Sequence, residues 1–155
     1  MNNEILFGIG GGILSYQLGI VKFITENCDL KNLRNNYYFG GASAGAISSL
    51  VLCCVVHNIY SVDYWFNNIY LDFLQKITQS KSGAWFKIDK IIPKVIEKSY
   101  FIIKSKQKSI SFLNNRYHLS VTEFPSFQKK IIDNFSDCNQ LIKWIMISCN
   151  APLLN

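Results

Sequence analysis

The segment Gly41-Ala42-Ser43-Ala44-Gly45 is the part of this 155-residue chain whose residue types and spacing most clearly suggest chemistry. It matches the pattern G-x-S-x-G, in which a serine lies on a sharp turn between a strand and a helix and exposes its hydroxyl above a sheet. The small flanking residues let the backbone make this turn and let a substrate approach. At a helix N-terminus, unpaired N–H groups also favour developing negative charge. The segment therefore predicts Ser43 as the nucleophile of an acyl transfer.

A second glycine-rich segment precedes this motif, where Gly10, Gly11 and Gly12 follow the short apolar run Ile5–Phe7. Successive backbone N–H groups in such a turn bind anions, and acyl transfer needs donors of this kind for its tetrahedral oxyanion. We expect these three glycines to form an oxyanion hole. A purely structural strand-to-helix turn is the alternative. Phosphate binding is disfavoured, because the segment lacks the lysine of G-x-x-x-x-G-K-[ST] and does not fit G-x-G-x-x-G.

Neither histidine is well placed to activate Ser43. His57 lies on the helix that we expect to follow Ser43, and a rise of 1.5 Å per residue puts it roughly 20 Å away. His118 lies on an expected strand, where a structural role is the better interpretation. An α/β-hydrolase triad also places its histidine late in the chain, after the acid. A Ser-His-Asp triad is therefore disfavoured.

The elements around these motifs alternate between strand and helix. Ile5–Phe7 and Tyr37–Phe39 are short apolar runs that end in glycines, and both predict buried strands. Helical spacing of apolar residues follows each of them, over Ile13–Ile24 and Ala44–His57. This alternation predicts an α/β domain with a mainly parallel sheet.

Two amphipathic stretches follow in the middle of the chain. Residues 62–77 carry an aromatic-rich apolar stripe at helical spacing, with Ser61 as the expected N-cap. Residues 88–103 repeat the rhythm, with Pro93 expected in the first turn of a helix, where its missing N–H is tolerated. We expect the first stripe to pack against the core rather than form a binding surface, whereas the second helix is amphipathic and basic and could also lie against a membrane.

The last part of the chain predicts one more strand and one more helix. Tyr117–Thr122 alternates apolar and polar residues with period two, and Asp137 and Gln140 have the spacing of a helix capping box. We expect residues 1–155 to form one domain. Its sheet would be incomplete at the C-terminus.

Positive charge is concentrated between Lys76 and Lys108, which holds nine of the 16 Lys and Arg residues against Asp89 and Glu97 alone. Two interpretations remain open for this stretch. It is either a solvated basic helix face or a surface that contacts anionic membrane. Nucleic-acid binding has no motif in its support, and we expect none.

The composition favours some classes of protein over others. The five cysteines form no C-x-x-C pair and fit reduced thiols better than a disulfide framework, and the two histidines have no ligand-like spacing to them. We therefore expect no metal and no other cofactor. The N-terminus lacks the features of a secretory signal, and the apolar run Ala44–Val56 is too short to span a bilayer. A cytoplasmic location, with or without peripheral membrane contact, is the expectation; the sequence does not indicate an oligomeric state.

Taken in order, the triple-glycine turn, helix, strand, G-x-S-x-G and helix resemble the patatin-like phospholipase family. His118-Leu-Ser-Val-Thr-Glu-Phe-Pro125 resembles the central V-T-D/E strand of that family, and Ile147-Ser-Cys-Asn-Ala-Pro152 resembles its A-S-x-A-x-P segment. Together these matches span nearly the whole chain.

The resemblance implies a three-layer α/β/α fold and a lipid acyl hydrolase that acts on phospholipids or neutral lipids through a Ser-Asp dyad. Ser43 would be acylated, and Gly10, Gly11 and Gly12 would hold the oxyanion. The sequence departs from the pattern of the family at two places. The family usually has a further glycine and a basic residue after the triplet, where this chain has Ile13-Leu-Ser15. The catalytic Asp of the family lies in a D-G-[GA] motif, and no Asp of this chain precedes a glycine. A chain without that Asp is expected to be inactive, or to be a non-catalytic lipid-binding relative.

Overall fold

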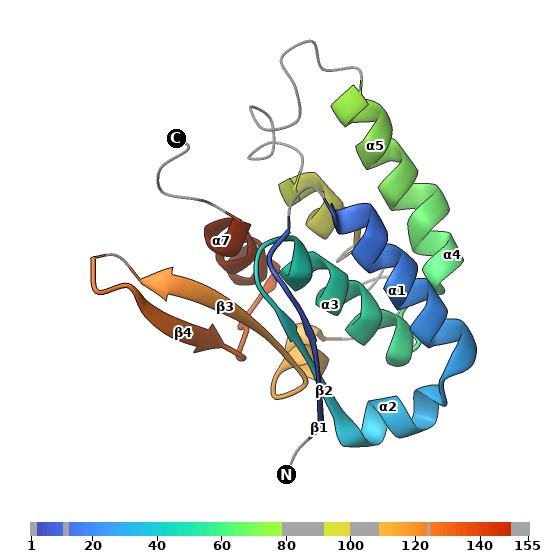
Figure 1. Cartoon of the computed structure of the whole chain (residues 1–155), viewed down its shortest axis with the longest axis horizontal. Helices are drawn as coiled ribbons and strands as arrows, with labels where there is room; N and C mark the ends of the chain where they lie inside the picture. The colour runs from blue at the N-terminus through green and yellow to red at the C-terminus, as the bar shows by residue number, and fades with distance from the viewer. Residues whose placement is uncertain (1–2, 11–12, 79–91, 100–108, 124, 150–155) are drawn as a thin grey trace.

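The computed structural model describes residues 3–10, 13–78, 92–99, 109–123 and 125–149 of the chain. It shows an α/β protein with a four-stranded mixed sheet in the order β1-β2-β3-β4 (Figure 1). The strands are β1 (Asn3–Phe7), β2 (Tyr37–Gly41), β3 (Tyr117–Glu123) and β4 (Gln128–Ile132). The first three are parallel, and β4 is antiparallel to β3. The predicted α/β class and mainly parallel sheet are confirmed.

Helices connect and cover these strands. The principal ones are α1 (Leu14–Asn27), α2 (Leu30–Asn36), α3 (Ala44–Val56), α4 (Val62–Trp65), α5 (Leu71–Thr78) and α7 (Cys138–Cys149). A π-helical turn, η2 (Phe66–Tyr70), joins α4 to α5, and a 3₁₀ turn, η4 (Ile110–Leu113), precedes β3. Residues 92–99 are also helical, with Pro93 in the first turn as predicted. None of the described helices combines the length and apolar composition needed to cross a bilayer.

Helix α3 is the centre of the fold. All of its residues are buried, which explains why its sequence is apolar on every side rather than along one stripe. It packs between the sheet and α1 (Figure 1). The Tyr117 hydroxyl of β3 donates a hydrogen bond of 2.9 Å to the Ala46 carbonyl of this helix. This central position fixes the start of α3, and with it Ser43, relative to β1, β2 and β3.

The two faces of the sheet have different surroundings. Phe7, Phe39 and Leu119 lie on the face packed against α3 and α7, and all three are buried. Leu6 and Ile131 lie on the other face and are exposed. Among the described residues only the first face carries helices, so the third layer of the expected α/β/α arrangement is not seen in this part of the chain.

The caps predicted from the sequence are largely confirmed. Ser61 accepts a hydrogen bond of 3.1 Å from the Tyr64 N–H at the start of α4. Asp137 accepts one of 2.9 Å from the Gln140 N–H, and the Gln140 side chain returns to the N–H of Ser136 rather than that of Asp137. Helix α2 and strand β4 were not predicted from the sequence.

Candidate active site

Ser43 lies at the turn between β2 and α3, as the G-x-S-x-G pattern predicts. Its backbone has φ 56° and ψ −126°, a conformation that residues with a side chain rarely adopt. Such a conformation costs on the order of 1–3 kcal/mol and persists only where the surroundings impose it. The half-buried side chain is therefore held at a strained turn, the geometry associated with an exposed nucleophile.

Glycine is required at both glycine positions of the motif, because backbone atoms of neighbouring residues approach closely there. A Cβ on Gly45 would collide with the carbonyl oxygen of Phe7 and would lie 2.6 Å from that of Gly8. A Cβ on Gly41 would collide with the backbone of Gly45 and lie 2.8 Å from the Phe7 oxygen. Both glycines thus let the end of β1 pass directly beside the Ser43 turn.

Helix α7 holds the turn from the other side. The Ser43 N–H donates a hydrogen bond of 2.9 Å to Ser148 Oγ, and the Ser148 hydroxyl donates one of 2.8 Å to the Ser120 carbonyl. The neighbouring Cys149 thiol interacts with the Ser43 side chain. Burial raises the pKa of Cys149 to about 11, an effect that this interaction partly offsets. At neutral pH the thiol is therefore protonated and cannot act as the base for Ser43.

Gln17 of α1 links the end of β1 to helix α3. Its Nε2 donates a hydrogen bond of 2.9 Å to the Gly8 carbonyl, and its Oε1 accepts one of 3.0 Å from the Ser48 hydroxyl in α3. Both side chains are buried. Gln17 was not among the residues predicted from the sequence. The available signal was a polar residue among the apolar positions Leu14, Leu18 and Val21, since a buried polar side chain must find a partner.

Two groups of oxyanion donors were expected from the glycine-rich segments. Gly10 is described, and its carbonyl accepts a hydrogen bond of 3.0 Å from the Ile13 N–H, whereas Gly11 and Gly12 lie outside the described residues. At the other turn, no described residue accepts a hydrogen bond from the Ala44 N–H at the start of α3. The amide that follows the nucleophile is a usual oxyanion donor, so Ala44 joins the candidate site through its backbone.

The structure brings neither histidine to Ser43 by a described contact. His57 is the C-cap of α3, at the opposite end of that helix. His118 lies beside Gly40 on the open face of the sheet, at a place that a Cβ on Gly40 would occupy. Burial lowers the pKa of His118, which favours the neutral ring. Among the described carboxylates none is hydrogen-bonded to Ser43, and no group of described side chains is arranged to hold a metal.

A hollow of about 710 Å³ begins beside the Ser43 turn and runs over the open face of the sheet. Ala42 and Ile9 border it at the turn, and His118 lies further along it. A hollow of this size is within the range of small-molecule sites. A space of substrate size therefore lies next to the Ser43 turn.

Comparisons of this chain with protein-family models, with curated proteins and with solved structures find no match. The roles of Ser43 and of the glycine turns consequently remain predictions, whereas their positions are those that the structure shows.

Proposed function

We propose that this chain carries the nucleophile half of a serine-dependent lipid acyl hydrolase of the patatin-like type. The observation that supports this most is the backbone of Ser43, strained at φ 56° between a parallel strand and a buried helix. Proteins keep such strain mainly at functional sites. The order of motifs along the chain supports the same assignment, and the three-layer fold of that family belongs to the proposal.

In the proposed reaction, Ser43 Oγ attacks the acyl carbonyl carbon while its proton passes to a carboxylate. The oxyanion is held by the Ala44 N–H and by N–H groups of the Gly10–Gly12 turn. The intermediate then collapses, the ester C–O bond breaks, and the alcohol leaves with that proton. Water hydrolyses the acyl-serine and frees the carboxylic acid.

The carboxylate is the missing part of this scheme. No Asp in the 155 residues has the D-G-[GA] context of the family, and the described carboxylates make no hydrogen bond to Ser43. We assign the acid to polypeptide outside these residues, either a longer product of the same gene or a second protein. On its own the chain should therefore turn over ester substrates very slowly.

The proposed substrates are phospholipids or neutral lipids. Ile9, which is exposed next to Gly10, gives the site an apolar border suited to an acyl chain. The proposed contact with anionic membrane rests on the basic stretch, of which Lys94 and Lys98 belong to the described helix at residues 92–99. Charge reversal of Lys87, Lys90, Lys94 and Lys98 should then weaken binding to anionic vesicles; unchanged binding would exclude this contact.

The test uses a fluorophosphonate probe and a short-chain nitrophenyl ester on this chain and on a form extended through the adjoining reading frame. Ser43→Ala serves as the negative control and Ser126→Ala, in an exposed turn, as the matched control. Labelling and turnover in the extended form, lost in Ser43→Ala and kept in Ser126→Ala, are expected. A folded extended form without Ser43-dependent labelling would exclude the hydrolase.

A second candidate is a non-catalytic lipid-binding relative. The lack of a hydrogen bond between Ser43 and any described carboxylate favours it. In that case vesicle or fatty-acid binding would persist while both forms of the chain fail to react with the probe.

A further inference from the structure

Ser148 of α7 bonds differently from other serines in the described helices. Ser48, Ser49 and Ser99 each donate to the carbonyl four residues back in their own helix, as helical serines commonly do. Ser148 instead donates a bond of 2.8 Å to the Ser120 carbonyl of β3 and accepts one of 2.9 Å from the Ser43 N–H. Its half-buried hydroxyl therefore joins α7 both to the sheet and to the start of α3.

The bond to Ser120 determines how the Ser148 hydroxyl can serve the Ser43 turn. A hydroxyl has one proton to donate and two lone pairs with which to accept. Because the proton goes to the Ser120 carbonyl, Ser148 Oγ offers the turn lone pairs only. It therefore attracts an N–H group and would repel a carbonyl oxygen in the same place.

This preference acts on the peptide group between Ala42 and Ser43. The N–H of this peptide donates to Ser148, and its carbonyl oxygen accepts a bond of 2.9 Å from the Gly45 N–H. A half-turn of the peptide would carry the φ of Ser43 from 56° to about −124°, an extended value without strain. It would also turn the Ala42 carbonyl toward Ser148 and break the bond to Gly45. Ser148 thus opposes the motion that would relieve the strain at Ser43.

The same contacts leave one amide of the turn available to a substrate. Four of the five N–H groups from Ala42 to Ala46 have acceptors among the described residues, and that of Ala44 is the exception. The direction of the Ala44 N–H depends on the ψ of Ser43, which is −126°. Fixing the Ser43 backbone therefore also aims this donor, as preorganised oxyanion stabilisation requires.

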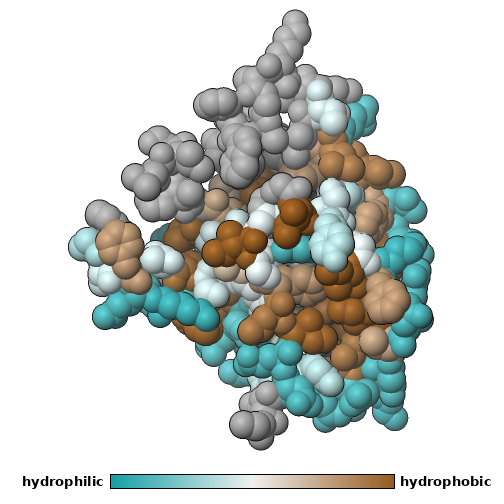
Figure 2. Space-filling view, viewed as in Figure 1, coloured by the Kyte–Doolittle hydropathy of each residue, from teal (hydrophilic) through white to brown (hydrophobic). Residues whose placement is uncertain are grey.

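The surface beside the turn offers little to replace Ser148. Figure 2 shows hydrophobic surface around the end of β1, the strand that passes next to the turn. Among the described residues, Ser148 is the one side chain that accepts a hydrogen bond from an N–H group of the turn. A half-buried N–H that loses its acceptor is costly, so the turn should rearrange when the Ser148 hydroxyl is removed.

We infer that Ser148 is a positioning residue for the nucleophile: its hydroxyl holds the Ala42–Ser43 peptide in the orientation that raises Ser43 Oγ and aims the Ala44 N–H. The inference rests on the proposed acyl hydrolase function. It means that α7 and β3 act on the reaction through the backbone geometry of the turn rather than by contact with the acyl group.

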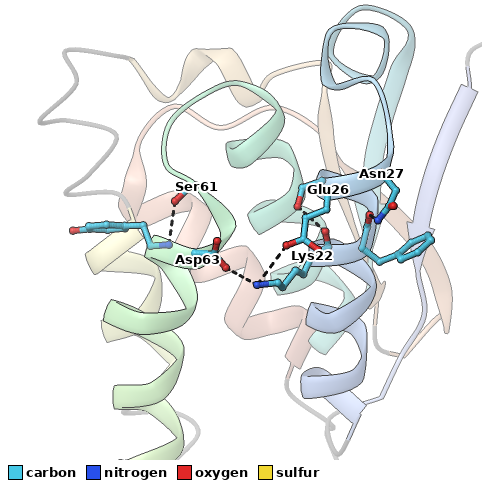
Figure 3. Close-up of polar contacts among 8 residues, drawn as sticks. Lys22, Glu26, Asn27, Ser61 and Asp63 are labelled. Carbon is cyan, nitrogen blue, oxygen red and sulfur yellow. Dashed lines mark hydrogen bonds and ion pairs between the residues drawn. The ribbon is translucent and has the colours of Figure 1, made fainter.

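Hydrogen exchange of the Ser43 amide in this chain, followed by NMR, tests the structural part. Ser61→Ala is the matched control, because Ser61 Oγ also accepts a backbone N–H, that of Tyr64 at 3.1 Å, but at the start of α4 (Figure 3). We expect exchange at Ser43 to be at least about tenfold faster in Ser148→Ala. Ser148→Thr, which keeps the hydroxyl, and Ser61→Ala should stay within about threefold of the wild type.

The extended form of the chain, with the fluorophosphonate probe and the nitrophenyl ester, tests the chemical part. We expect Ser148→Ala to lower the labelling rate and kcat at least about tenfold and to leave KM within about twofold, because attack is misaligned while the substrate still binds. Ser148→Thr and Ser61→Ala should keep at least about a third of the wild-type kcat. Circular dichroism confirms that each variant is folded.

The outcomes distinguish this inference from the proposed function. If the extended wild type is labelled at Ser43 and Ser148→Ala reacts equally fast, the inference is wrong and the hydrolase stands. Unchanged exchange at Ser43 in Ser148→Ala, an equal loss of kcat in Ser61→Ala, or a folded Ser148→Thr as slow as Ser148→Ala would also overturn the inference alone. A folded extended form without Ser43-dependent labelling would exclude the hydrolase and this inference with it.

Discussion

The turn at Ser43 and the open face of the sheet at Gly40 lie close together along β2, yet different kinds of contact hold them. The Ser43 turn lies against backbone atoms of β1, and its N–H donates a hydrogen bond to Ser148 of α7, while Gln17 of α1 donates one to the adjoining Gly8 carbonyl. At Gly40 the neighbour is the ring of His118, a side chain that can rotate. The first region tolerates little change because its geometry is imposed by the backbone, whereas the second can adjust. Substitutions in the two regions should therefore differ sharply in effect.

The largest expected effect comes from Gly45→Ala. The added Cβ meets the Phe7 and Gly8 carbonyl groups, so β1 and α3 must separate, and we expect a loss of at least about 3 kcal/mol in the free energy of unfolding. Gly40→Ala should cost much less, since the His118 ring can move aside. Urea denaturation of both variants measures this. Equal losses would contradict the contrast between backbone and side-chain neighbours.

Loss of the Gln17 network should come next. Gln17→Leu removes the partner of the Gly8 carbonyl and one partner of Ser48, whose hydroxyl keeps its 3.2 Å bond to the Ala44 carbonyl. We expect a cost of about 1–3 kcal/mol for the unpaired polar groups, measured by urea denaturation. Gln75→Leu, on the exposed side of α5, is the control and should change stability little. If Gln17→Leu left the free energy of unfolding unchanged, the network would not be what holds the glycine turn.

Removal of the whole Ser43 side chain should stabilise the protein. Ser43→Gly relieves the strain of φ 56° and should raise the free energy of unfolding by about 1 kcal/mol, whereas Ser43→Ala keeps a Cβ and should not. Thermal unfolding of the two variants gives the comparison. A less stable Ser43→Gly would mean that the turn is not strained, which would weaken the main support for a nucleophile.

The smallest expected effect is the pH dependence that His118 contributes. Because burial lowers its pKa below the usual 6.5, the folded protein favours the neutral ring. This contribution to stability is present above pH 6.5 and is lost as the pH falls from 6.5 through the lower pKa of the folded state. Lowering the pH from 7.5 to 5.5 should therefore decrease the melting temperature of the wild type more than that of His118→Gln. An unchanged difference would mean that the ring is fully solvated.

Much of the fold could be predicted from the sequence because the relevant signals are local. The apolar runs before Gly8 and Gly40 gave β1 and β2, and the unbroken apolar stretch from Ala44 gave α3. Strand β4 was missed because four of its five residues are exposed, which leaves almost no apolar alternation to detect. The π-helical turn η2 was missed because the apolar rhythm continues through it.

By itself, the sequence determined that Ser43 lies on a tight turn between a strand and a helix, since G-x-S-x-G after an apolar run leaves the chain few other conformations. Only the tertiary structure decided what surrounds that turn. Ser148 of α7 accepts a hydrogen bond from the Ser43 N–H, and Gln17 of α1 accepts one from Ser48 of α3, so both bonds join residues far apart in the chain. Packing of α3 against three strands sets those distances, and no local pattern of residues records them.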